Sequence, residues 1–262
     1  SAVASIPRDT NNIVWIGAAD FKEELWNEYL KESRKEDMKI VPVFLDKKVE
    51  SLYYNGFSNT VIWPLFHYFP SFAEYEESYY RAYRAVNQQF AEVVKSVAGE
   101  NDIVWVHDYH LMLLPGFLKK GTKKVNSSFF LQLPFPTYEL FKLVPEDWRT
   151  EMLNSLLACE VCGFQIQEHA SHFKRALSYF LGIETMNNQA VLNGHVTYIK
   201  DYPISIDFEK FNNAFDDENV AGIRQQIRKK HEDVRIVFSI DRLDYSKGVS
   251  NRLQAYEELL KE

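Results

Sequence analysis

The stretch Ile103-Val104-Trp105-Val106-His107-Asp108-Tyr109-His110 carries the pattern that decides the fold of this chain. Four apolar residues of the kind that favour strands are followed by a polar cluster with a carboxylate, and residues 110–119 then have helical spacing. A second apolar run follows at residues 129–133. An apolar strand, a polar strand end and a helix in this order predict a βα unit of a parallel sheet.

The same alternation extends along the chain and predicts an α/β fold, a Rossmann-like parallel sheet with flanking helices. Asn193-Gly194 lies between two apolar runs and is the pair that a tight type I′ turn prefers, so it predicts a β-hairpin. The predicted strands are residues 13–16, 40–44, 61–63, 103–106, 129–133, 161–165 and 234–240. The predicted helices are residues 72–97, 110–119, 148–157, 169–181, 220–231 and 249–260.

A change in composition divides the chain near its end. The segment Tyr202-Pro203-Ile204-Ser205-Ile206-Asp207 and the polar stretch after it are typical of a passage between domains. We therefore expect one domain over residues 1–230 and the first βα unit of a second domain over residues 231–262. A single βα unit cannot bury its own sheet, so it must dock on the first domain or be continued by further chain.

Composition excludes several classes of protein. With 262 residues, 46% of them hydrophobic, the chain can bury a full core. The formal charge of −7 does not fit a nucleic-acid partner, and we expect the densest basic run, Lys119, Lys120, Lys123 and Lys124, to be a solvated helix end. No run approaches the roughly twenty apolar residues of a membrane span, and residues 1–5 do not resemble a signal peptide. We expect a cytoplasmic protein without a membrane partner.

Two patterns could be mistaken for metal or redox sites. Cys159 and Cys162 form an isolated C-x-x-C, for which buried thiols are the favoured interpretation. His169 and His172 share one helix face without a third ligand at a useful spacing, so we interpret them as polar helix positions. The sequence predicts no metal site.

Candidate site residues gather where predicted strands end, which is where parallel sheets bind ligands. Aromatic planes beside carboxylates suit a sugar, and Tyr54, Trp63 and Asp108 could supply such contacts. For Trp63 an ordinary core position is the alternative. The polar or aromatic strand ends are Trp63-Pro64-Leu65-Phe66-His67-Tyr68, His107-Asp108-Tyr109-His110, Gln132-Leu133-Pro134-Phe135-Pro136 and residues 241–248.

Arg242 and Lys247 flank a predicted loop between strand and helix, and the following helix would aim its positive end at the same space. That arrangement suits a diphosphate, because two fixed cations and helix amides can stabilise the charge of a leaving nucleotide. The alternative is a surface cluster in which Arg242 pairs with Asp241 or Asp244. The chain has no Asp-x-Asp pair that would hold a metal at such a site.

Five motifs in order resemble the trehalose-6-phosphate synthase family, glycosyltransferase family 20. The resemblance runs from about Trp15 to the end of the chain. It implies a GT-B fold and transfer of glucose from UDP-glucose to glucose 6-phosphate, with retained configuration and without a metal or other cofactor. The motifs are residues 52–59, Trp63-Pro64 with Phe66-His67-Tyr68, Val106-His107-Asp108-Tyr109-His110-Leu111, Pro134-Phe135-Pro136 and Arg242-Leu243-Asp244-Tyr245-Ser246-Lys247-Gly248.

The resemblance also implies roles for residues. Tyr54 would contact the acceptor phosphate, and Trp63 and Asp108 would hold the acceptor sugar. Arg242 and Lys247 would hold the donor diphosphate, and Gln132 stands where the family has a histidine that reaches the donor glucose. The site residues implied as catalytic are Asp108, Gln132, Arg242 and Lys247.

The chain departs from the family pattern at three further points. Ala18 stands where a tryptophan near the acceptor is usual, and Ser205 replaces a glycine. The family's first strand and Gly-Gly loop are expected before Ser1, and most of the nucleotide-binding domain is expected after Glu262, so this fragment alone is expected to be inactive.

Two other functions stay open. Gln132 and Ala18 lie where sugar identity would be recognised, so a related coupling enzyme with a changed substrate is one alternative. A catalytically silent homologue that binds sugar phosphates as a regulator is the other. Small sugar phosphates and sugar nucleotides are the expected partners, and the sequence leaves homo-oligomer formation open.

Overall fold

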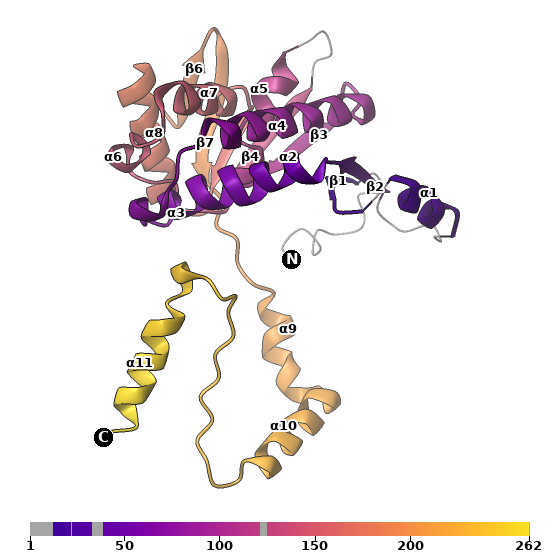
Figure 1. The fold of residues 1–262 in the computed structure, drawn as a ribbon, viewed down its shortest axis with the longest axis vertical. Coiled ribbons are helices and arrows are strands. Elements are labelled where there is room, and N and C mark those ends of the chain that lie inside the picture. The colour runs from indigo at the N-terminus through magenta and orange to yellow at the C-terminus, as the bar shows by residue number, and fades with distance from the viewer. Residues whose placement is uncertain (1–12, 22, 33–38, 121–124, 262) are drawn as a thin grey trace. The chain divides into compact units, whose positions relative to one another are not determined.

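The computed structural model describes residues 13–21, 23–32, 39–120 and 125–261, and it divides into two compact units, residues 1–203 and 204–262. The domain boundary predicted after residue 230 concerns the complete protein and stays a prediction. Lys123 and Lys124 of the basic run lie outside the described residues. Figure 1 shows the elements of both units in chain order.

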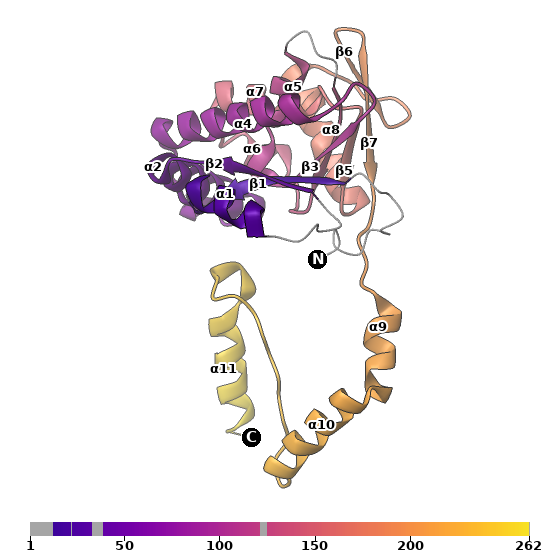
Figure 2. The same cartoon turned by 90° about the vertical axis from the view of Figure 1, so that its right-hand side faces the viewer.

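The first unit contains a five-stranded sheet of order β3-β4-β5-β7-β6. Figure 2 labels β3, β5, β7 and β6 of this sheet. Neighbouring strands from β3 to β7 run parallel, and only β6 is antiparallel to its neighbour. This arrangement confirms the predicted α/β class with a mainly parallel sheet. The five strands are β3 (Ile103–His107), β4 (Asn126–Leu131), β5 (Val161–Phe164), β6 (Gln189–Leu192) and β7 (His195–Asp201).

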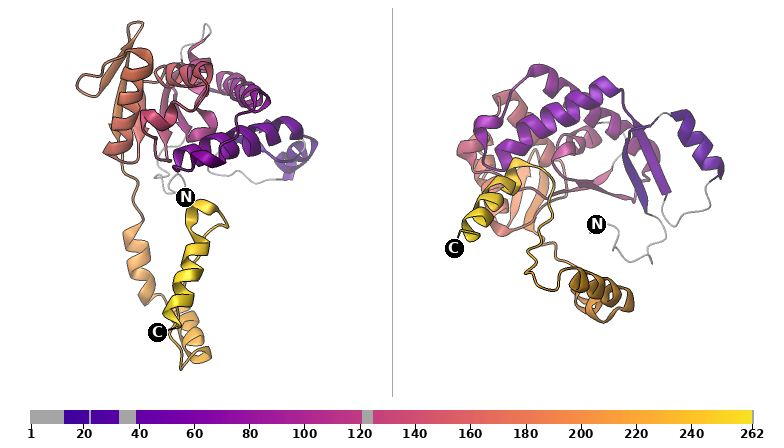
Figure 3. Two further views of the ribbon diagram at one scale, coloured as in Figure 1. Left: turned by 60° about the vertical axis from the view of Figure 1, so that its left-hand side comes forward. Right: turned by 60° about the horizontal axis from the view of Figure 1, so that its bottom comes forward.

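The predicted hairpin is confirmed at the edge of this sheet, where β6 and β7 project together in Figure 3. Its turn residues, Asn193 and Gly194, have φ of 51° and 78°, the left-handed conformation that a type I′ turn requires at both positions. The Asn-Gly pair therefore predicted this turn correctly from local sequence alone.

A separate pair of parallel strands, β1 (Val14–Ala19) and β2 (Lys39–Phe44), belongs to the same unit. In the described part of the chain, β1 pairs only with β2, and β3 pairs only with β4. A cavity of about 550 Å³ is lined by Val14–Ala18 on one side and Ile103–His107 on the other. The two strands thus face each other across a gap along their length.

Helices cover the sheet and supply most of the core. The longest, α4 (Glu77–Val97), packs beside a continuous helical run made of α2 (Lys47–Ser51), the π-helix η2 (Leu52–Ile62) and α3 (Trp63–Phe66), as Figure 1 shows. The other described helices of this unit are α1 (Glu23–Glu32), η3 (Pro70–Phe72), η4 (Tyr109–Leu111), α5 (Leu114–Lys119), α6 (Tyr138–Phe141), α7 (Glu146–Leu156) and α8 (Gln167–Leu181).

The strand predicted at residues 61–63 is wrong, because these residues end the π-helix and begin α3. Val61 and Ile62 are fully buried and Trp63 nearly so. A short apolar run that is buried on all sides has no period from which a strand and a helix could be distinguished. Helix was favoured here by continuity with α2 and packing against α4.

The second unit consists of short helices joined by extended chain. It contains α9 (Phe208–Asn213), η5 (Ala214–Asp216), α10 (Glu218–Lys230), η6 (Tyr245–Lys247) and α11 (Val249–Leu259). Residues 234–240 form no strand, contrary to the prediction, and Phe238 and Ile240 are each 80% exposed. An apolar segment becomes a strand only when another strand satisfies its backbone groups, and no described strand of this unit does so.

Candidate functional site

The centre of the candidate site is Asp108, which directly follows β3. Its backbone N–H donates to the Phe130 carbonyl of β4 at 2.8 Å, and its Oδ1 accepts the Gln132 backbone N–H at 3.2 Å. The carboxyl ends of β3 and β4 therefore bring together two predicted site residues, Asp108 and Gln132. The Gln132 side chain itself is exposed.

The backbone of Asp108 is strained. Its φ of 66° and ψ of 177° lie in a region that almost only glycine adopts, at a cost of about 1–3 kcal/mol. Such a conformation persists when the surrounding structure holds it, and it turns the carboxylate toward the amides at the end of β4. Strain of this kind is concentrated at binding sites.

Electrostatics set the state of this carboxylate. Burial raises the pKa of Asp108, and the backbone N–H groups of Tyr109, Gln132 and Leu133 act in the opposite direction by stabilising the anion. A half-buried carboxylate with fixed donors on one side keeps lone pairs for a ligand's hydroxyl groups on the other.

Trp63 lies next to this loop at the start of α3. Its ring is 4.0 Å from the His67 ring and 5.9 Å from the Tyr109 ring between centroids. His67 Nδ1 is 2.7 Å from the Trp63 carbonyl oxygen, which fixes the imidazole over the indole. Trp63 is only 9% exposed, so the core interpretation describes most of its surface, while its ring contacts Tyr109 of the segment after Asp108.

Tyr54 projects from the π-helix and is 45% exposed. Its ring stacks on His110 at 5.3 Å with an interplanar angle of 7°. His110 belongs to the segment after Asp108, so Tyr54 and Asp108 are linked through it. A π-helix offsets side chains from their α-helical positions.

His110 is a residue to which the sequence patterns assigned no role. Burial lowers its pKa to about 4, so the imidazole is neutral at physiological pH. Its Nε2 is buried without a hydrogen-bond partner among the described residues, and the side chain lines the 550 Å³ cavity together with Tyr54 and Ala18. The place of His110 in the motif of residues 107–110 could have pointed to it from the sequence. Its neutral state could not be predicted, because that state depends on burial in the fold.

Arg242 and Lys247 lie in the second unit. Arg242 precedes the short turn η6, and Lys247 is the last residue of that turn. Asp244 caps this turn by accepting the Ser246 backbone N–H at 2.8 Å, and Gly248 at φ 61° leads into α11. Asp241 forms an ion pair with Arg252 at 2.8 Å. Arg252 also donates to the Lys247 carbonyl oxygen at 3.2 Å, so this residue of α11 ties the helix to the loop of residues 241–247.

Other candidates are resolved in favour of structural roles. Cys159 and Cys162 are free, buried thiols, as predicted, and Cys162 Sγ donates to the Leu156 carbonyl. His172 Nδ1 is 2.9 Å from the Phe135 carbonyl oxygen, which ties α8 to residues 134–136. Over the described ranges, no three His, Cys, Asp or Glu side chains gather as metal ligands, and no helix is long and apolar enough to cross a bilayer.

The mainly parallel sheet with flanking helices defines an α/β, Rossmann-like domain. The family model of glycosyltransferase family 20 matches residues 1–262, so the chain belongs to that family.

The relatives found by comparison are longer than this chain. A bifunctional trehalose-6-phosphate synthase/phosphatase from Thermoproteus tenax is 39% identical over 250 residues, which cover 95% of this chain and 34% of the relative. Residues 1–262 thus span about a third of that protein.

Two solved structures have the same fold. An E. coli structure with bound UDP-2-fluoro glucose has a TM-score of 0.80 and 25% identity, over 95% of this chain and 61% of that one. A UDP-forming alpha,alpha-trehalose-phosphate synthase from Burkholderia xenovorans in complex with glucose-6-phosphate also has a TM-score of 0.80, at 23% identity, over 95% and 62%.

Proposed function

We propose that the complete protein containing residues 1–262 transfers glucose from UDP-glucose to glucose 6-phosphate, with retained configuration, and releases trehalose 6-phosphate and UDP. The observation that carries this proposal is the cluster around Asp108, where a half-buried carboxylate, an indole ring and a stacked phenol come from three separate elements. The ligands of the two related structures, a sugar phosphate and a UDP-sugar analogue, support it.

On the acceptor side, three residues have complementary roles. Asp108 accepts hydrogen bonds from the hydroxyl groups of the acceptor sugar, for which an ionised carboxylate is a strong partner. The Trp63 ring packs on the C–H face of the sugar. The exposed Tyr54 phenol donates to the acceptor phosphate, and the neutral His110 beneath it adds no charge to that site.

On the donor side, Arg242 and Lys247 neutralise the diphosphate as the sugar leaves, which is the step at which its charge develops. Gln132 reaches toward the donor glucose and can donate and accept a hydrogen bond without carrying charge. The acceptor hydroxyl attacks on the face that UDP leaves, and a phosphate oxygen takes its proton. We expect residues 1–262 alone to be inactive, because they span only 34% of one related protein and 61% of another.

We further propose that an extended segment of the complete protein fills the cavity between β1 and β3. Both walls are parallel strand edges without a partner on that side in the described chain. One added strand would join the two sheets. Backbone amides of β1 and β3 should then exchange hydrogen more slowly in the complete protein than in residues 1–262.

The proposed reaction is tested by supplying the complete protein with UDP-glucose and glucose 6-phosphate. We expect trehalose 6-phosphate and UDP in equal amounts, and loss of both products in Asp108→Ala. If both ligands bind but no product forms, the proposed activity is wrong and a regulatory role replaces it. If only another acceptor is glucosylated, the site belongs to a related coupling enzyme.

A further inference from the structure

The segment directly after Asp108 is held by two buried side chains of α4. Tyr83 and Asn87 are one helical turn apart and both are fully buried. Neither has any route to a ligand in the described structure, so they cannot act on one directly. Their polar atoms are nevertheless directed at a single short segment, residues 109–113.

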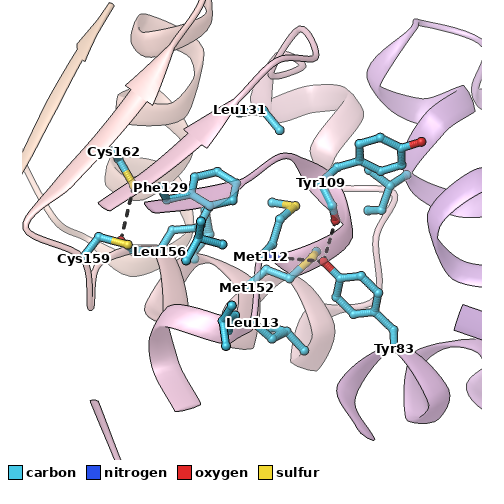
Figure 4. Close-up of a cluster of buried hydrophobic side chains, with 14 of the residues drawn as sticks. Tyr83, Tyr109, Met112, Leu113, Phe129, Leu131, Met152, Leu156, Cys159 and Cys162 are labelled. Atoms are coloured by element: carbon cyan, nitrogen blue, oxygen red, sulfur yellow. Dashed lines mark hydrogen bonds between the residues drawn. The ribbon is translucent and has the colours of Figure 1, made fainter. Parts of the chain in front are cut away.

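The Tyr83 hydroxyl bridges two backbone groups of that segment, at residues 109 and 112. It donates to the Tyr109 carbonyl oxygen at 2.6 Å and accepts the Met112 backbone N–H at 2.9 Å. Figure 4 shows the hydroxyl between these two backbone groups, inside the apolar core. Burial raises the pKa of Tyr83 well above its usual value, so the phenol keeps the proton that it donates.

Asn87 completes the same clamp. Its amide nitrogen donates to the His110 carbonyl oxygen at 3.1 Å and to the Tyr83 carbonyl oxygen at 2.9 Å. Its side-chain oxygen accepts the Leu113 backbone N–H at 3.1 Å. The two side chains thus satisfy four backbone groups between Tyr109 and Leu113, which would otherwise be buried without partners.

This clamp acts where Asp108 is strained. On one side Asp108 is tied to β4 through the Phe130 carbonyl, and on the other the chain passes at once into the clamped segment. A residue in a conformation that almost only glycine adopts keeps it when both flanks are fixed. Releasing residues 109–113 would let Asp108 relax and would shift both its carboxylate and the His110 ring beneath Tyr54.

We propose that Tyr83 and Asn87 are positioning residues for acceptor binding: α4 fixes residues 109–113 and thereby sets the orientation of Asp108 and Tyr54. This inference rests on the proposed function, in which Asp108 and Tyr54 contact glucose 6-phosphate. It assigns control of acceptor affinity to a helix that touches neither substrate.

The test compares Tyr83→Phe with Tyr80→Phe in the complete protein. Tyr80 is on the same helix, is also buried, and its hydroxyl donates to Glu151 at 2.7 Å, so both variants lose a hydroxyl with a strong partner. Of these two hydroxyl groups, only that of Tyr83 is hydrogen-bonded to residues 109–113 in the described structure. We expect Tyr83→Phe to raise the KM for glucose 6-phosphate about 10- to 100-fold, since small misplacements have effects of that size.

The KM for UDP-glucose should stay within about twofold in both variants, and Tyr80→Phe should leave both KM values unchanged. Asn87→Ala should reproduce the Tyr83→Phe pattern, and it serves as the second variant if Tyr83→Phe folds poorly. Equal effects of Tyr83→Phe and Tyr80→Phe on the acceptor KM would overturn the inference, because both would then report lost stability alone.

Amide hydrogen exchange separates this inference from the proposed function. Met112 should exchange faster in Tyr83→Phe than in Tyr80→Phe, regardless of which substrate the protein uses. If the unmodified protein fails to bind glucose 6-phosphate, the proposed function is wrong, and unchanged Met112 exchange in Tyr83→Phe would refute the clamp by itself. If it binds, and Tyr83→Phe binds equally well, only the positioning role is wrong.

Discussion

The segment after Asp108 and the segment around Arg242 carry the two halves of the proposed site, and the chain holds them in opposite ways. Residues 109–113 are fixed by two fully buried side chains and by the neighbouring strand. None of the described residues 204–261 is buried, and Leu243, next to Arg242, is 94% exposed. The first geometry is thus fixed by a buried core, whereas the second is carried by exposed chain.

The largest effect is expected at Arg242, in the exposed segment of the second unit. Arg242→Ala in the complete protein should lower kcat about 100- to 1,000-fold, because a fixed charge at the leaving group acts mainly in the transition state. Steady-state kinetics measure this loss. Arg235→Ala, an exposed arginine of the same unit, is the matched control, and an equal loss in that variant would refute the assignment.

The second largest effect is expected at Asp108, next to the segment that buried side chains fix. Asp108→Asn should weaken glucose 6-phosphate binding about 10- to 100-fold, because a neutral amide replaces a charged acceptor of hydrogen bonds. Affinity for UDP should not change. Calorimetric titration measures both. Asp102→Asn is the control, since Asp102 also accepts a backbone N–H, that of Gly99, but lies before β3. Unchanged acceptor binding in Asp108→Asn would contradict the proposed role.

Acid should destabilise the same region. The pKa of His110 is about 4 in the folded protein and higher when unfolded, so the unfolded state binds more protons between these values. Stability is therefore complete above about pH 6.5 and falls, by at most about 3 kcal/mol, as the pH drops toward 4. His110→Phe keeps the stacked ring and should lose less stability over this interval. Urea unfolding at pH 7 and pH 4.5 measures the difference, and identical losses would refute this origin.

The smallest effect is expected at Gln132. Gln132→His should raise kcat less than about tenfold and leave UDP affinity unchanged, because the donor site would gain a group that can carry charge or a proton. Gln132→Asn is a control that keeps the amide but shortens its reach. A fall in turnover in Gln132→His would contradict this prediction and would indicate that the donor site is adapted to glutamine.

Sequence predicted the elements whose determinants are local. The hairpin at Asn193 follows from turn preference, and α4 follows from apolar spacing, although it begins at Glu77 rather than at residue 72. The segment at residues 61–63 could not be predicted, since uniform burial removes periodicity. The strand predicted at residues 234–240 is wrong for a different reason, because a strand depends on a partner elsewhere in the chain.

The site shows the same division. The grouping of Asp108 with Gln132 follows from the rule that parallel strands end at one edge, and Trp63 and Tyr54 were named from their aromatic character. The clamp by Tyr83 and Asn87 could not be predicted, because on a helix their spacing is that of ordinary core residues. Nor could the strain at Asp108 be foreseen, since it arises from the neighbouring backbone.

Titration of residues 1–262 with glucose 6-phosphate and, separately, with UDP tests most directly the idea that this chain builds the acceptor side by itself. We predict measurable binding of glucose 6-phosphate that is lost in Asp108→Ala, and no detectable binding of UDP. Binding of UDP that is tighter than that of glucose 6-phosphate, and that persists in Asp108→Ala, would contradict this division of the site.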